Sequence, residues 1–233
     1  MTAAQAFFAI CPRGLEELVA QELRTCAASG CTIEPGGVAF AGSLKVAYAA
    51  NLQSRLASRI LWRVLRGAYA DEDDVYEAAR SVAWEQWFGA NELLRVDVTA
   101  TRTPLRSREF ATLRIKDAIV DRLREKTGAR PSIDRARPDV RVFAHLGADQ
   151  LDLYLDLSGE ALFKRGWRAD KGEAPLKENL AAGLLALGGW TPALPLLDPF
   201  CGSGTIAIEA AAICARCPPG LARRFAFERL RTF

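Results

Sequence analysis

The residues with the clearest chemical potential lie between positions 194 and 212. An apolar run ends at Asp198, a turn containing Gly202 and Gly204 follows, and an alanine-rich stretch begins near Thr205. This order predicts a strand, a tight loop and the N-terminus of a helix. Because glycine has no Cβ, a flat ligand can approach the backbone N–H groups of such a loop, and the positive end of the helix dipole favours negative charge there.

The octet at 198–205, Asp-Pro-Phe-Cys-Gly-Ser-Gly-Thr, is followed by Ile-Glu-Ala at 208–210. It resembles the S-adenosylmethionine motif of class I methyltransferases, and in particular the THUMP-bearing branch that methylates the exocyclic amine of guanine in RNA. The resemblance implies S-adenosylmethionine as cofactor, held by Asp198, Pro199, Phe200, Cys201, Gly202, Ser203, Gly204 and Thr205.

A dinucleotide-binding fingerprint is the competing interpretation, because Gly202, Gly204 and Ala207 formally fit its spacing. The Asp-Pro-x-Cys prefix argues against it. A nicotinamide enzyme also needs an acidic residue about twenty positions beyond the loop. At that distance the chain has Arg223 and Arg224.

A second segment, at 174–182, resembles the part of these enzymes that lies against the cofactor. The resemblance makes Glu178 and Asn179 further cofactor candidates, and a plain helix-capping role is an equally open explanation. Pro175 suits the first turn of a helix.

Composition bounds the class of protein. Of the 233 residues, 50% are hydrophobic and 25% are charged, which is typical of one or two soluble globular domains. The net charge of +3 is small, but its distribution is uneven. Residues 100–141 hold twelve Lys or Arg against six Asp or Glu, whereas residues 1–90 hold eight against ten. A basic region in the middle of the chain favours a nucleic-acid partner.

The six cysteines are scattered, and no secretory signal or apolar run of membrane length accompanies them. We therefore expect reduced thiols, a cytoplasmic location and no membrane contact. Cys214 and Cys217 have the spacing of half a zinc site. No second pair matches them and His145 is the single histidine, so we expect no metal.

Toward the N-terminus, the pattern predicts a strand at 7–10, a helix at 15–23 and two strands at 31–34 and 38–40 around a glycine turn. These elements suggest a small α+β, ferredoxin-like unit. After a short helix at 43–50, the apolar residues of 52–65 recur at helical spacing. Arg55, Arg59 and Arg63 repeat every four residues. Such a row of arginines could contact a phosphate backbone, and an equally open explanation is a solvated helix face whose charge is balanced by the acidic residues at 71–74.

Farther along, strands are predicted at 94–100, 140–146 and 151–157, and the last should have one buried face. A helix should place Ala111, Ile115, Ala118, Ile119 and Leu123 inward. The loop at 101–108 carries arginines and hydroxyls, which suit phosphate oxygens. This region resembles a THUMP domain, an RNA-binding unit, and 158–168 resembles the linker that follows it. The RNA-binding candidates are Arg55, Arg59, Arg102, Arg106, Arg108, Arg114, Lys116 and Arg168.

The sequence thus predicts an α/β chain with a ferredoxin-like segment (1–43), a THUMP domain (44–157) and a linker with the start of a Rossmann-like methyltransferase domain (158–233). In the family that the chain resembles, an Asn or Asp followed by Pro-Pro and an aromatic residue binds the target base. No such motif occurs here, so we expect a truncated chain without catalytic residues. The resemblance implies large-subunit ribosomal RNA as substrate. A non-catalytic RNA-binding or assembly module is the alternative.

Overall fold

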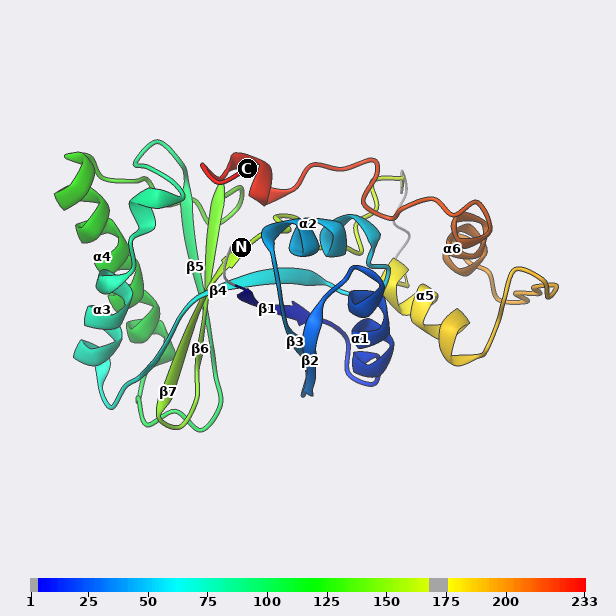
Figure 1. Cartoon of the computed structure of the whole chain (residues 1–233), viewed down its shortest axis with the longest axis horizontal. Helices are drawn as coiled ribbons and strands as arrows, with labels where there is room; N and C mark the ends of the chain where they lie inside the picture. Colours follow the sequence, from blue (N-terminus) through cyan, green and yellow to red (C-terminus); the bar gives the residue numbers. More distant parts are fainter. Residues whose placement is uncertain (1–3, 168–175) are drawn as a thin grey trace. The chain divides into compact units, whose positions relative to one another are not determined.

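The computed structural model describes residues 4–167 and 176–233. The chain forms two compact units, one from Met1–Ile60 with Glu160–Phe225 and one from Leu61–Gly159 with Ala226–Phe233. Both units combine helices and strands, so the expected α/β class is confirmed (Figure 1). No helix in the described ranges has the length and apolar character needed to span a membrane.

The first unit contains the N-terminal elements and the region around the glycine loop. Its elements are β1 (Gln5–Ile10), α1 (Glu16–Thr25), β2 (Ser29–Glu34), β3 (Gly37–Gly42), α2 (Leu44–Gln53), α5 (Glu178–Leu187) and α6 (Thr205–Cys214). β3 lies between β1 and β2 and is antiparallel to both. The strand, helix and hairpin expected at the N-terminus are therefore confirmed.

The turn between β2 and β3 depends on glycine. Gly36 has a φ of +84°, and a Cβ on Gly37 would lie 2.5 Å from the carbonyl oxygen of Ala9. Position 37 therefore cannot carry a side chain, because the backbone of β1 lies too close to it. Phe7 and Phe40 stack beside this turn with ring centroids 5.2 Å apart, so the strands share an aromatic core.

The second unit is built on a four-stranded sheet. Its elements are β4 (Arg59–Ala68, which begins in the first unit), α3 (Glu72–Ser81), η1 (Trp84–Gln86), β5 (Leu94–Ala100), α4 (Arg108–Thr127), β6 (Val140–Leu146), β7 (Gln150–Asp156) and η2 (Ala226–Arg229). The strand order is β4-β7-β6-β5, and only the β5–β6 pair is parallel.

Helices α3 and α4 lie side by side on one face of this sheet (Figure 1). The Ser107 hydroxyl caps α4 by accepting a hydrogen bond from the Phe110 amide at 3.1 Å, and the Asp71 carboxylate caps α3. The five apolar residues predicted to face inward on α4 are all fully buried. Trp84 is also fully buried, and its indole N–H donates to the carbonyl of Ala79.

The helix expected at 52–65 was a wrong prediction. Residues from Arg59 onward form the strand β4, and α2 ends at Gln53. A four-residue repeat fits one face of a helix, but because four is an even number it also fits one face of a strand. The run Ile60-Leu61-Trp62, which is β-branched, aliphatic and aromatic, is buried on both sides as in a central strand.

Two further predictions are corrected. The apolar run at 194–198 does not form a strand. Leu197 is 87% exposed, and a strand needs a neighbour for its backbone hydrogen bonds and apolar side chains. Strand β7 is buried on both faces instead of one. Asp152 lies in the second buried face because Arg66 donates two hydrogen bonds to its carboxylate.

Candidate cofactor and RNA sites

The glycine loop leads directly into α6, as the sequence predicts. Gly202 has a φ of +51° and Gly204, the residue before α6, a φ of +73°, so both occupy the left-handed region where glycine is favoured. The Gly204 amide bonds to the carbonyl of Cys201 at 2.7 Å. Within the described ranges, the amides of Cys201 and Gly202 donate to no backbone carbonyl. The loop therefore leaves backbone donors accessible at the positive end of a helix.

The side chains of this loop also leave it open. Phe200 is 93% exposed, and a Cβ on Gly202 would meet no atom within 4 Å. The Asp198 carboxylate folds back to accept the Phe200 amide at 3.2 Å, while Thr205 is buried at the first turn of α6. An approaching ligand can thus reach the backbone of the loop together with the exposed side chains of Phe200 and Cys201.

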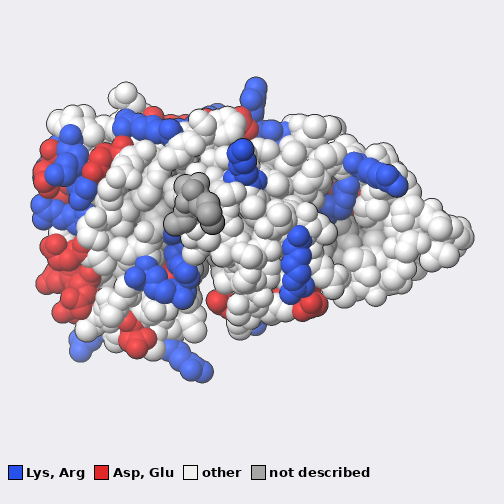
Figure 2. Space-filling view, in the orientation of Figure 1, with Lys and Arg blue, Asp and Glu red and all other residues white. Residues whose placement is uncertain are grey.

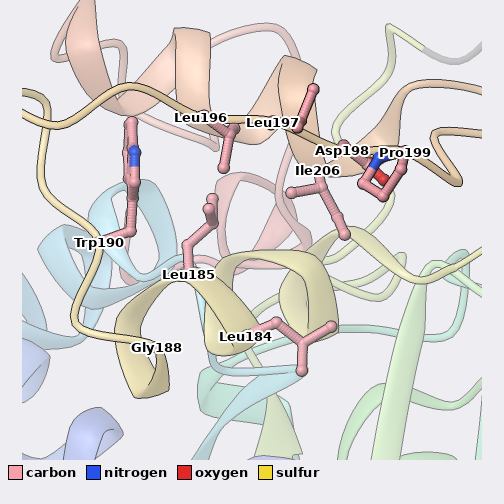
Figure 3. Close-up of a pocket in the computed structure, with 9 residues that line it drawn as sticks. All are labelled: Leu184, Leu185, Gly188, Trp190, Leu196, Leu197, Asp198, Pro199 and Ile206. Carbon is pink, nitrogen blue, oxygen red and sulfur yellow. The ribbon is translucent and has the colours of Figure 1, made fainter.

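An apolar groove of about 260 Å³ adjoins the loop (Figure 3). It lies between α5 and α6 and meets the loop at Asp198 and Pro199. In the close-up, Leu185 and Leu196 point toward each other from α5 and from the segment before the loop. The other lining residues are Leu184, Gly188, Trp190, Leu197 and Ile206. An apolar wall beside open amides suits a ligand that has both a flat apolar part and a charged part.

The second pair of cofactor candidates begins α5. Glu178 and Asn179 are both buried. The Asn179 side-chain amide donates to the carbonyl of Leu56 at 3.3 Å and to the Ser58 hydroxyl at 3.1 Å. The structure thus joins Asn179 to the segment that precedes β4. Pro175, the expected helix start, lies outside the described residues.

The arginine-bearing loop before α4 is exposed. Arg102, Arg106 and Arg108 are all on the surface, and Arg102 has a φ of +59°. Thr103 anchors the loop by accepting a hydrogen bond from the Tyr69 hydroxyl at 2.7 Å. The guanidinium groups of Arg102 and Arg106 therefore extend from a loop that Thr103 anchors, and that of Arg108 extends from the first residue of α4, where it lies 3.5 Å from the Glu109 carboxylate. Exposed guanidinium groups of this kind suit contact with phosphate oxygens.

The remaining RNA candidates lie in different settings. Arg114 stacks on Tyr76 and pairs with Asp73, and Lys116 pairs with Asp117 at 2.7 Å. At the end of the molecule that holds α3 and α4, basic and acidic side chains are intermixed in the upper part of the view, and a patch of acidic side chains lies below them (Figure 2). Arg59 lies on β4, and Arg168 falls outside the described residues. The basic excess of 100–141 is thus partly neutralised on the helices and concentrated in the loop.

Arg55 was expected in a row with Arg59 and Arg63, but the structure does not form that row. Arg55 precedes β4, and its guanidinium lies 3.6 Å from the Glu209 carboxylate of α6. Arg165 of the linker reaches the same carboxylate at 3.2 Å. Sequence reasoning missed this cluster. Its only local signal is a single carboxylate in a helix that otherwise consists of small and apolar residues.

Family profiles match three parts of the chain. The profile described as RlmL ferredoxin-like domain matches residues 6–61, that of the THUMP domain residues 69–156, and that of the RMKL-like methyltransferase domain residues 165–233.

Known proteins resemble the chain over nearly all its length. It is 46% identical over 224 residues to the ribosomal RNA large subunit methyltransferase K/L of Aeromonas salmonicida, covering 96% of this chain and 31% of that protein. The chain spans about a third of the length of the curated relatives that it matches.

Two solved structures share the fold. One is named a predicted N6-adenine-specific DNA methylase from Listeria monocytogenes, with a TM-score of 0.87 and 32% identity over 97% of this chain and 59% of that one. The other is a methyltransferase complexed with SAH, with a TM-score of 0.86 and 30% identity over 100% of this chain and 62% of that one. The glycine loop, the three matched profiles and these relatives agree with the resemblance that the sequence indicates: the chain is similar to methyltransferases that carry a THUMP domain, and it spans only a part of them.

Proposed function

We propose that this chain supplies the RNA-binding part and the cofactor loop of an S-adenosylmethionine-dependent methyltransferase that modifies the exocyclic amine of guanine in large-subunit ribosomal RNA. The observation that carries the proposal is the open loop at 202–204, which leads into α6 in a chain that also has a THUMP domain. The proposed division is the one expected from the sequence, with parts at 1–43, 44–157 and 158–233. We place the protein in the cytoplasm, where its ribosomal substrate is made.

The residues of the loop fit the proposed cofactor. S-adenosylmethionine would supply an electrophilic methyl group on a sulfonium centre. The open amides of Cys201 and Gly202 suit its anionic end, and the groove beside Pro199 suits its apolar part. Asp198, Pro199, Phe200, Ser203, Gly204 and Thr205 complete the proposed loop site. Glu178 and Asn179 would support it through the start of α5.

The RNA site that we propose is centred on Arg102, Arg106 and Arg108. Their exposure and their position on one anchored loop and at the start of α4 support phosphate contacts, which give affinity that falls as salt rises. Arg59, Arg114, Lys116 and Arg168 remain secondary candidates. We do not assign an RNA contact to Arg55, because its guanidinium is engaged with α6.

The RNA site is tested by filter binding of a large-subunit RNA fragment at several salt concentrations. Replacing Arg102, Arg106 and Arg108 together by Gln should weaken RNA binding. The fall of the logarithm of the association constant with the logarithm of the salt concentration should also become less steep, by about 0.7–0.9 for each phosphate that the variant no longer neutralises. Arg124→Gln is the matched control, since Arg124 is an exposed arginine of α4 that pairs with Asp121 of the same helix. Unchanged affinity and slope in the triple variant would exclude this loop as the RNA site.

Activity is tested by transfer of a labelled methyl group from S-adenosylmethionine. The protein expressed from its complete gene should label unmodified large-subunit RNA on guanine, whereas the 233-residue chain alone should label nothing, because it has no motif that holds the target base. Labelling by the 233-residue chain would refute this second expectation.

The same assay separates the alternatives. Labelling of adenine in DNA and not of RNA would favour the activity in the name of the Listeria protein. Salt-dependent RNA binding by the complete gene product, without any response to cofactor, would favour a non-catalytic RNA-binding module. A nicotinamide oxidoreductase is disfavoured because Arg223, near the position of the acid it needs, donates to the carbonyls of Ala161 and Lys164.

A further inference from the structure

Helix α6 contains a single charged residue, and that residue is buried. Glu209 lies in the second turn, four residues after Thr205, and is 1% exposed. The rest of the helix consists of Thr, Ile, Ala and Cys. A carboxylate in such surroundings is costly unless cations and hydrogen-bond donors compensate it. The partners of Glu209 therefore determine how α6 is held.

Arg165 is the first partner, and each of its three guanidinium nitrogens donates a hydrogen bond. Nε donates to Glu209 Oε1 at 3.2 Å, Nη1 to the carbonyl of Leu162 at 2.8 Å and Nη2 to the carbonyl of Arg55 at 2.6 Å. The side chain is 3% exposed. Three directional bonds from one planar group fix the orientation of Arg165, so the position of Glu209 relative to it is also fixed.

Arg55 holds the other end of the same helix. Its Nη1 lies 3.6 Å from Glu209 Oε2, and its Nη2 donates to the carbonyl of Ala212 at 3.2 Å and to that of Cys217. These carbonyls lie in the last turn of α6 and just beyond it. A cation at this end also interacts favourably with the helix dipole. Two arginines thus hold α6 at its middle and at its C-terminus.

The base of this cluster is α1. The Glu22 carboxylate accepts hydrogen bonds from the Ser54 hydroxyl at 2.6 Å, from the Arg55 amide at 3.0 Å and from the Leu56 amide at 3.3 Å. The backbone that carries Arg55 is therefore attached to a helix of the N-terminal elements. A continuous chain of contacts leads from α1 to the helix that begins at the glycine loop.

We infer that Arg165, Glu209 and Arg55 are positioning residues that fix the cofactor loop through α6. The inference rests on the proposed function of that loop. The loop itself makes few internal hydrogen bonds and is exposed, so the direction of its amides follows from the placement of α6. The N-terminal elements thus determine where the loop lies, and they support the cofactor site although they do not contact the ligand.

The test compares two binding reactions of the protein expressed from its complete gene. Glu209→Gln keeps the side-chain volume but removes the charge, and Arg165→Met removes the guanidinium group with its three hydrogen bonds. Each change should weaken S-adenosylhomocysteine binding, measured by calorimetry, by about tenfold or more. The double variant should be no weaker than Arg165→Met, because both changes remove one shared contact. RNA affinity should stay within about twofold.

The matched control is Glu125→Gln, since Glu125 is in an exposed pair with Arg80 and should affect neither reaction. If Glu209→Gln fails to fold, Arg165→Lys keeps the charge and cannot make the three bonds at once, so it should weaken cofactor binding and not RNA binding. Cofactor affinity within about twofold of wild type in the folded variants would overturn the inference. Equal losses of cofactor and RNA affinity would also overturn it, since they would indicate general destabilisation.

Absence of cofactor binding in the wild-type protein would refute the proposed function. The claim that Glu209 fixes α6 would then be tested separately, by a measurement that needs no cofactor. Hydrogen exchange at the amides of 206–210 should then be faster in Glu209→Gln by about tenfold or more, with the amides of β6 and β7 unchanged. Equal exchange at 206–210 in the two proteins would refute the positioning itself.

Discussion

The hydroxyl of Ser54 donates a hydrogen bond to the carboxylate of Glu22 across 2.6 Å. Burial raises the pKa of this carboxyl above its ordinary value of 4.5, although the bonds from Ser54, Arg55 and Leu56 and the charge of Arg165 act in the opposite direction. The attachment of α1 to the segment before β4 therefore depends on pH.

A folded-state pKa above the unfolded value means that the folded protein binds the proton more tightly. The contribution of Glu22 to stability is then fully present below pH 4.5 and is lost as pH rises through the folded pKa. Urea unfolding should show that the free energy of unfolding of wild type, minus that of Glu22→Gln, falls from pH 4.5 upward. Glu17→Gln, an exposed neighbour on α1, is the control. A difference independent of pH would contradict the assignment.

Thiol reactivity should follow burial. Burial raises the pKa of Cys11 to about 12, whereas Cys201, Cys214 and Cys217 are exposed. Because the thiolate is the reactive form, a thiol reagent at pH 8 should label the three exposed cysteines rapidly and Cys11 only after unfolding. Mass spectrometry of the labelled peptides measures this order. Labelling of Cys11 in the native protein at the rate of Cys201 would show that β1 is not packed as described.

Helix α5 packs so closely on the N-terminal elements that a side chain at Gly183 would have to displace the side chain of Leu15. A Cβ there would lie 2.7 Å from Leu15 Cδ1 and 2.9 Å from its Cδ2. Gly183→Val should lower the free energy of unfolding by about 1–3 kcal/mol through overpacking. Ala186→Val, on the exposed side of the same helix, should cost about 0.5 kcal/mol. Equal effects of the two changes would mean that α5 does not contact Leu15.

In the second unit, Asp152 neutralises two arginines of β4. Arg66 donates to its carboxylate at 2.7 and 2.9 Å, and Arg63 lies at 4.0 Å. Asp152→Asn should lower the free energy of unfolding by about 1–2 kcal/mol, because the two guanidinium groups lose a countercharge while water compensates part of the loss at the 43% exposed Arg66 side chain. Asp117→Asn, which removes the pair of the half-exposed Asp117 carboxylate with Lys116, should have little effect. Thermal unfolding compares the two, and equal shifts would contradict the buried pair.

Elements with a clear local pattern could be predicted from the sequence. Alternation predicted β5 and β6 within their bounds, and a polar cap at Ser107 with Gly128 beyond the last turn marks α4. The loop around Gly202 could also be predicted, because only glycine adopts its backbone conformation readily.

The sequence could not predict features that depend on distant partners. The repeat at 52–65 fits a helix and a strand equally, and the neighbouring strand decides between them. The run before Asp198 has the composition of a strand but no pairing strand among the described residues. The cluster around Glu209 joins residues 44 positions apart in the chain, so no local pattern indicates it.

The open cofactor loop is the central claim, and S-adenosylhomocysteine titration of the protein expressed from its complete gene tests it most directly. Wild type should bind saturably, and Gly202→Val should abolish binding, because a branched side chain strains a φ of +51° and covers the amides. Gly128→Val carries similar strain at a φ of +73° beyond the last turn of α4, away from the loop and the groove, and it should bind as wild type does. Unaltered binding by Gly202→Val, or no binding by wild type, would contradict the claim.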